Sequence, residues 1–170
     1  MKVLFYGGRQ AGMVVLLSLL GLEIDVFSVI PEDDIVSQVA SNFDLKTDPV
    51  NKINDKSFVD SLKKENIDLI ICCHGRKILD NSMLSIGAIN LHPCLYKYKG
   101  KDPIKRLLND KETKASVGCH WMVEEVDQGG VITEKFIEVS GDTEVEIYNQ
   151  LYPLYSEVLV ESMNKIKNNK

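Results

Sequence analysis

A short apolar segment near the middle of the chain carries an amide and an imidazole two residues apart. Residues 87–93 read Gly-Ala-Ile-Asn-Leu-His-Pro, with Asn90 and His92 as the polar pair. Side chains at positions i and i+2 of a strand share one side, and Pro93 keeps the preceding residue extended. The segment predicts a strand end that presents a neutral hydrogen-bonding amide and an imidazole able to change its charge near neutral pH. A structural strand end whose polar pair is satisfied locally remains the alternative.

A carboxylate follows downstream, on a loop between two further predicted strands. Residues 115–123 and 131–139 are rich in β-forming side chains, and Gly129-Gly130 between them is typical of a turn. Asp127 therefore falls on a loop, where a rigid scaffold often carries functional groups. An aspartate before glycines also commonly bonds its own backbone, so a purely structural role stays open.

The elements that must position these residues alternate between strand and helix along the chain. Strands are expected at 2–6, 23–30, 67–73, 87–93, 115–123 and 131–139, and helices from the turn at 7–12 to about 20, then at 33–42, 57–65, 102–109 and from 143. This order predicts an α/β fold with a doubly wound, mostly parallel sheet and helices on both faces. Ligands of such folds bind at the carboxyl ends of the strands, which is where the 87–93 strand presents its polar pair.

Two helix starts carry capping signals. Ser57 and Asp60 approximate a capping box at the start of one helix, and Thr143 and Glu146 form one at the start of the last helix. Pro153 is expected to kink that last helix.

The combination of Asn-x-His-Pro with Val-Asp-x-Gly-x-Val-Ile at 126–132 resembles the folate-dependent formyltransferase family. Its members include glycinamide ribonucleotide formyltransferase, the catalytic domain of methionyl-tRNA formyltransferase and sugar N-formyltransferases. Residues 70–79 resemble the family's strand and folate-binding loop, residues 95–100 its basic loop, and 141–143 the start of its last helix. Each motif alone is weak, but their combination is specific, and it implies a Rossmann-like formyltransferase fold.

The resemblance implies transfer of a formyl group from 10-formyltetrahydrofolate to a primary amine, with no metal. Its catalytic residues would be Asn90, His92 and Asp127. A protonated His92 and the Asn90 amide would stabilise the oxyanion formed by attack of the amine. Asp127 would favour the imidazolium and accept the proton of the amine. The cofactor-binding residues implied are Arg76, Lys77, Ile78, Leu79, Val126 and Asp127.

Three further places in the sequence are candidates for the acceptor. The glycine-rich turn at 7–12 suits an anion through its backbone N–H groups, lacks the dinucleotide spacing, and in the resembled family lies beside the amine substrate. Residues 96–101 hold a basic and aromatic cluster that suits a phosphate. The third place is His120. The structural alternatives are a tight connection for the turn at 7–12, a solvated loop for residues 96–101 and a packed strand histidine for His120. The expected substrate-binding residues are Gly8, Arg9, Gln10, Lys97, Lys99 and His120.

Departures from the family pattern bear on the acceptor. Cys94 stands where serine usually follows His-Pro, Tyr96-Lys97 replace Leu-Pro, and Arg9-Gln10 interrupt the phosphate loop of the glycinamide ribonucleotide enzymes. A nucleotide-linked amino sugar is therefore the first expectation, with glycinamide ribonucleotide or methionyl-tRNA as alternatives. The appended RNA-binding domain of the tRNA enzyme is not expected within 170 residues. A formyltetrahydrofolate hydrolase and a non-catalytic nucleotide- or metal-binding protein are the alternatives of another class.

Composition narrows the partners and the location. The net charge of −5 argues against a dedicated nucleic-acid binder, and the sequence has no apolar run long enough to span a membrane. The cysteines and histidines at 72–74, 92–94 and 119–120 lack the spacing of a zinc site or of a secreted disulfide framework. We expect a cytoplasmic single catalytic domain at 1–165 with a frayed tail at 166–170. Its partner would be a small-molecule amine, possibly phosphorylated or nucleotide-linked, and a homo-oligomer is possible.

Overall fold

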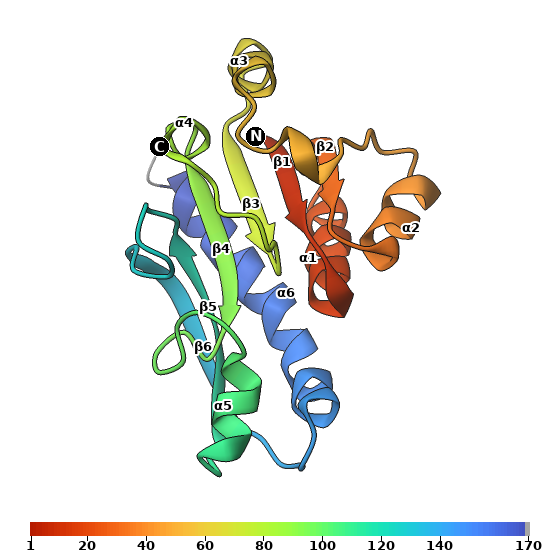
Figure 1. Cartoon of the computed structure of the whole chain (residues 1–170). Helices are drawn as coiled ribbons and strands as arrows, with labels where there is room; N and C mark the ends of the chain where they lie inside the picture. The colour runs from red at the N-terminus through yellow and green to blue at the C-terminus, as the bar shows by residue number, and fades with distance from the viewer. Residues whose placement is uncertain (169–170) are drawn as a thin grey trace.

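A computed structural model describes residues 1–168. They form a six-stranded sheet in the order β2-β1-β3-β4-β5-β6 (Figure 1). The strands are β1 (Lys2–Gly7), β2 (Asp25–Pro31), β3 (Leu69–Cys73), β4 (Ala88–Pro93), β5 (Lys114–Trp121) and β6 (Val131–Glu138). The first four strands pair in parallel, whereas β4–β5 and β5–β6 are antiparallel. The strand order reverses at β1, so a topological switch point lies between β1 and β3.

Helices cover both faces of this sheet. They are α1 (Arg9–Gly21), α2 (Asp34–Asn42), α3 (Lys56–Lys64), α4 (Asn81–Leu84), α5 (Pro103–Asn109) and α6 (Glu144–Asn168), with a short 3-10 turn η1 (Val50–Lys52). Val3 and Phe5 of β1 join one core with α1, α2 and α6, whereas Leu4 and Tyr6 join the other with α3 and α4. Successive strand side chains point to opposite faces, so one strand serves both cores. The predicted α/β class, mostly parallel sheet and two covered faces are confirmed.

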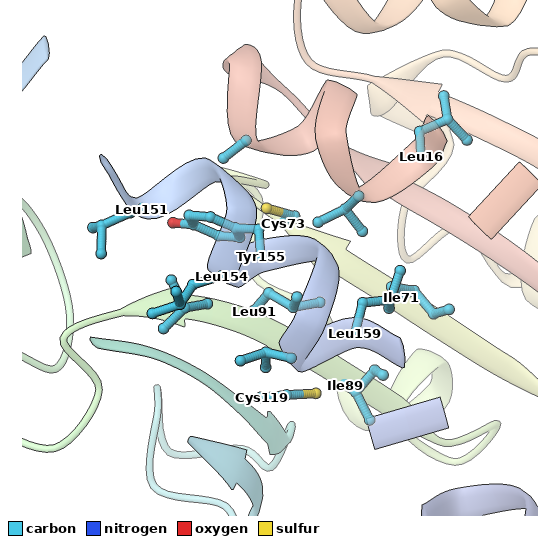
Figure 2. Close-up of a cluster of buried hydrophobic side chains, with 14 of the residues drawn as sticks. Leu16, Ile71, Cys73, Ile89, Leu91, Cys119, Leu151, Leu154, Tyr155 and Leu159 are labelled. Atoms are coloured by element: carbon cyan, nitrogen blue, oxygen red, sulfur yellow. The ribbon is translucent and has the colours of Figure 1, made fainter. Parts of the chain in front are cut away.

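The long helix α6 organises the larger core. Figure 2 shows its leucines and Tyr155 packed over Cys73 of β3 and Leu91 of β4. Tyr155 and Leu91 are almost fully buried. Ser18 of α1 and Ser156 of α6 share a hydrogen bond of 2.9 Å, so α1 and α6 pack side by side behind the strands (Figure 1). Within residues 1–168, no helix has both the length and the apolarity that crossing a membrane requires.

Three local predictions differ from the structure. The Ser57 cap is wrong: Asp55 occupies the N-cap position of α3, because the chain turns at Asn54, whose φ is 73°, and Ser57 falls inside the first turn. Helix α4 was not predicted because it is a single turn, capped by Asp80, whose carboxylate accepts two backbone N–H groups at 3.0 Å. The frayed tail is predicted from residue 166, whereas α6 continues to Asn168 with Ile166 buried; residues 169–170 lie outside the described part.

The capping box of the last helix is confirmed. The N–H of Thr143 donates to Oε2 of Glu146 at 3.0 Å, and the N–H of Glu146 donates to Oγ1 of Thr143 at 3.3 Å. The same carboxylate accepts the N–H of Asp142 at 2.9 Å. These bonds fix where α6 begins. Pro153 lies inside α6, where it removes one helical hydrogen bond.

We expect Thr143→Ala to lower the free energy of unfolding by about 1 kcal/mol, because the first turn of α6 loses its reciprocal cap. Urea denaturation followed by circular dichroism measures this change. Ser140→Ala is the matched control, since Ser140 contributes only backbone groups to its contacts with Gln150. Equal stability of the two variants would contradict a role for the cap.

Candidate active site

The polar pair of β4 and a histidine of β5 share one face of the sheet. Asn90 and His92 are separated by one residue, and Asn90 is paired with His120 in the antiparallel ladder between β4 and β5. Ala88, two residues earlier, packs into the core under α3 and α4. Beyond that core, the same face carries the three polar side chains near the carboxyl end of β4.

The loop between β5 and β6 folds back so that Asp127 reaches all of them. Its Oδ2 lies 3.2 Å from Nε2 of His92, and its Oδ1 lies 3.3 Å from Nε2 of His120. Nδ2 of Asn90 lies 3.4 Å from Oδ1, and the N–H of Gly100 donates to Oδ2 at 2.8 Å. The structure thus brings Asn90, His92 and Asp127 into one cluster.

A glycine makes this return of the loop possible. A Cβ atom at Gly129 would lie 1.7 Å from the carbonyl oxygen of Trp121, whereas one at Gly130 would meet nothing within 4 Å. The same Trp121 oxygen is 2.8 Å from Nδ1 of His120. Asp127 itself has a φ of 55°, a left-handed conformation that non-glycine residues seldom adopt outside special sites.

The electrostatics of the cluster favour an ionised Asp127 beside a neutral His92. Burial raises the pKa of Asp127, but the hydrogen bond with His120 and the charge of His92 outweigh it and lower that pKa to about 2. Burial lowers the pKa of His92, and the opposing attraction of Asp127 does not compensate. Asp127 thus favours the imidazolium of His92, as expected, but burial has the larger effect, so the free protein does not favour the protonated form.

The surroundings of His92 indicate where its proton sits. Nε2 faces two acceptors, Oδ2 of Asp127 at 3.2 Å and the carbonyl oxygen of Gly100 at 3.0 Å, so Nε2 carries the hydrogen. Nδ1 is buried and has no hydrogen-bond partner among residues 1–168. A buried polar atom without a hydrogen-bond partner is unusual in native proteins, and a catalytic role is one explanation for it.

A cavity of about 380 Å³ opens after the carboxyl ends of β1 and β3, between the first turns of α1 and α6. His74, directly after β3, forms part of its wall, and its Nε2 lies 3.3 Å from the hydroxyl of Tyr155. The rings of Tyr148 and Tyr152 stack with centroids 6.3 Å apart. The lining residues are Arg9, Gln10, Ala11, His74, Glu144, Val145, Tyr148, Asn149 and Tyr152.

Sequence reasoning found only the α1 side of this cavity. Arg9 and Gln10 were predicted, but His74 and the α6 wall were not. The available signal was the pair Tyr148 and Tyr152, which share a helix face at i and i+4. Burial lowers the pKa of His74 to about 4, and the positive charges of Arg9 and His92 add to the effect.

The predicted folate-binding loop follows β3, and its side chains differ in what they contact. Ile78 is 65% exposed, and Val126 of the neighbouring loop is 52% exposed. Arg76 is instead paired with Glu32 at 3.1 Å, Lys77 donates to a backbone carbonyl at 3.2 Å, and Leu79 is buried in the core. The loop therefore presents apolar surface and backbone groups rather than free charges.

The remaining predicted substrate residues are placed differently from one another. Lys99 donates to the side chain of Gln128 at 2.9 Å and so lies beside the Asp127 loop. Lys97 forms ion pairs with Glu112 and Asp110, so its ammonium group already has two carboxylate partners within the protein. His120 is 1% exposed and directs its Nε2 to Asp127, so it orients the carboxylate instead of reaching a ligand. Among residues 1–168, no group of His, Cys, Asp or Glu side chains forms a candidate metal site.

Comparison with known proteins adds independent findings. The formyl transferase family model matches residues 25–163. Methionyl-tRNA formyltransferase of Thermotoga maritima is 29% identical, with 98% of this chain and 59% of that protein covered. The corresponding protein of Staphylococcus aureus strain Newman is 27% identical, with 97% and 58% covered. The chain thus spans less than two thirds of the length of these curated relatives.

Solved structures share the fold. The phosphoribosylglycinamide formyltransferase of Campylobacter jejuni matches with a TM-score of 0.78 and 25% identity, covering 98% of this chain and 97% of that one. The protein of the same name from Anaplasma phagocytophilum matches with a TM-score of 0.85 and 19% identity, covering 100% and 88%. A formyltetrahydrofolate deformylase from Pseudomonas syringae matches with a TM-score of 0.78 and 18% identity, covering 95% and 59%.

We expect Gly129→Ala to destabilise the fold by about 1–3 kcal/mol, because the added methyl group overlaps the Trp121 carbonyl. Gly130→Ala is the matched control and should change stability by less than about 0.5 kcal/mol. Thermal unfolding of both variants measures the difference. If the two unfold alike, the loop does not depend on the close approach at Gly129.

His74 should make stability depend on pH. Its folded-state pKa is about 4, against roughly 6.5 in an unfolded chain, so the unfolded chain binds the proton first. The contribution is complete above about pH 6.5 and is lost as the pH falls toward 4, by on the order of 3 kcal/mol. Urea denaturation across this range should show a shallower decline for His74→Phe than for the unmodified protein. If the free energy of unfolding falls equally in both proteins, His74 is not the group that takes up this proton.

Proposed function

Because the chain belongs to the formyl transferase family, we propose that it transfers a formyl group from 10-formyltetrahydrofolate to a primary amine. The observation that carries this proposal is the cluster of Asn90, His92 and Asp127 near the carboxyl end of β4. Amide and imidazole donors next to an ionised carboxylate suit acyl transfer, where negative charge develops on a carbonyl oxygen.

The residues of the cluster divide the work. The bound folate supplies the formyl group on its N10 nitrogen. Asn90 Nδ2 would donate a hydrogen bond to the formyl oxygen as the amine attacks. His92, whose Nε2 hydrogen is directed at Asp127 and Gly100, would stabilise the same developing charge through its own positive charge when protonated. His92 enters this reaction neutral, and Asp127, with a pKa of about 2, stabilises the imidazolium whenever His92 takes up a proton. Such a low pKa favours an electrostatic role for Asp127 over direct removal of the proton from the amine. As the new bond from the amine to the formyl carbon forms, the bond from that carbon to N10 would break, and the amine proton would pass through solvent to N10 of the departing tetrahydrofolate.

The loop after β3 fits the donor. Ile78 and Val126 offer exposed apolar side chains on which a flat ring can lie. Among the described residues, the carbonyl of Lys77 and the N–H of Leu79 have no hydrogen-bond partner in the protein. These backbone groups supply one acceptor and one donor for the polar edge of a pteridine.

The cavity supports an acceptor with a ring and an anionic group. In residues 1–168, the guanidinium of Arg9 has no ion-pair partner, and it lines the cavity with the stacked rings of Tyr148 and Tyr152. Guanidinium suits a phosphate, and aromatic faces suit a base or sugar ring. We therefore propose a nucleotide-linked amino sugar as acceptor. Glycinamide ribonucleotide and methionyl-tRNA follow as alternatives, since proteins named for these activities resemble this chain.

Hydrolysis of the same folate is the second candidate function, favoured by the fold shared with a formyltetrahydrofolate deformylase. Absorbance-monitored turnover of 10-formyltetrahydrofolate, with a panel of amines and with none, separates the two. Acceptor-dependent formation of tetrahydrofolate supports the transferase, and acceptor-independent release of formate supports the hydrolase. Failure to bind tetrahydrofolate in calorimetry would overturn both. The cytoplasmic location and a small-molecule partner remain predictions.

We expect Asn90→Ala, His92→Ala and Asp127→Ala each to lower kcat by about 100-fold or more, because each removes a group that acts in the transition state. Asn109→Ala, at the exposed end of α5, is the control and should leave kcat unchanged. Circular dichroism verifies that every variant is folded. Near-normal turnover of a folded triad variant would remove that residue from the mechanism.

A further inference from the structure

A tyrosine and a glutamate outside the catalytic cluster hold the loop after β3 from beneath. Tyr6, the penultimate residue of β1, is 1% exposed. Its hydroxyl donates to Glu32 Oε1 and accepts the N–H of Lys77 at 2.6 Å. Because β1 is the strand next to β3 in the sheet (Figure 1), the side chain of Tyr6 contacts the loop that follows β3 directly.

Glu32 completes the support from the end of β2. Its side chain is 8% exposed, and its carboxylate accepts the N–H of Arg76 at 2.9 Å and Nε of Arg76 at 3.1 Å. The consecutive N–H groups of Arg76 and Lys77 are thus bound by two buried side chains. Charge-assisted hydrogen bonds of this kind are stronger than neutral ones.

The fit between the loop and this support is close. A Cβ atom at Gly75 would lie 2.3 Å from Cε1 of Tyr6, so the tyrosine ring sits directly against the loop backbone. The far end of the loop is fixed by Asn54, which binds the carbonyl of Ile78 at 2.9 Å and the N–H of Asp80 at 3.0 Å. The segment has no regular secondary structure of its own, yet it is held at both ends.

The bonds leave the outer side of the loop free. Glu32 and Tyr6 accept the N–H groups of Arg76 and Lys77. Among the described residues, the carbonyl of Lys77 and the N–H of Leu79 have no hydrogen-bond partner, and the side chain of Ile78 is exposed. A loop fixed in this way needs little further ordering when a ligand binds, and reduced ordering raises affinity.

We propose that Tyr6 and Glu32 are positioning residues that pre-set residues 76–79 for the pteridine end of the formyl donor. The inference rests on the proposed function, and it adds that affinity for the donor depends on two side chains that touch neither the donor nor the reacting atoms. Tyr6 acts through the N–H of Lys77, and Glu32 acts through Arg76.

The test separates donor affinity from catalysis. Tyr6→Phe keeps the ring against Gly75 and removes only the hydroxyl, and Glu32→Gln keeps the shape and removes the charge. Each variant should raise KM for 10-formyltetrahydrofolate by about 3- to 30-fold, with kcat and the KM of the acceptor within about twofold. The dissociation constant of tetrahydrofolate, from calorimetry, should rise by the same factor. Hydrogen exchange at the Lys77 amide should accelerate in Tyr6→Phe.

Glu157→Gln is the matched control, since the Glu157 carboxylate accepts a hydrogen bond from Nζ of Lys135 at 2.9 Å, between β6 and α6 and outside every candidate site. Its donor KM should not change. If the unmodified protein binds tetrahydrofolate and Tyr6→Phe and Glu32→Gln bind it equally well, the inference is overturned while the proposed function stands. Loss of kcat, acceptor affinity and thermal stability together would indicate a merely structural role and would also overturn it. Absence of folate binding by the unmodified protein would overturn the proposed function itself.

Discussion

A buried carboxylate, Asp127, binds polar groups from three parts of the chain. Asn90 and His92 of β4, His120 of β5 and the backbone of Gly100 all direct polar groups at it. A desolvated charge is tolerated only when such partners compensate for lost water. The positions of the basic loop and of the β5–β6 loop therefore depend on one another through this group, and the low pKa of Asp127 expresses the same compensation.

Four of the ten described non-glycine residues with a positive φ lie near the carboxyl ends of the parallel strands or in the Asp127 loop. Arg9, His74, Cys94 and Asp127 have φ values of 59°, 57°, 53° and 55°, and three of them directly follow or nearly follow a parallel strand. Each left-handed residue that is not glycine costs on the order of 1 kcal/mol, so the surrounding packing must hold them in place. Conformations of this kind turn the chain sharply at the strand ends and bring side chains of different strands to one edge.

How far the sequence predicts the site depends on the distance between partners along the chain. Asn90 and His92 follow from strand periodicity, and the loop position of Asp127 follows from its glycines. The Tyr6–Glu32–Arg76 contacts could not be predicted, because nothing in a local pattern pairs residues of β1, β2 and the loop after β3. The effect of Asp127 on the pKa of His92 was predicted in the right direction, but the larger and opposite effect of burial is a tertiary property that the sequence does not show.

The pairing of α1 with α6 has a consequence for how the molecule is assembled. The Ser18–Ser156 hydrogen bond joins residues 138 positions apart, and α6 follows all six strands in the chain. Contacts of such long sequence separation carry a large cost in loop-closure entropy, and a ribosome makes α6 after every strand of the sheet. The triad residues and the loop after β3 are therefore synthesised before the α6 wall of the cavity. A nascent chain that has emerged as far as β6 contains every strand of the sheet but lacks the helix that covers one side of that cavity.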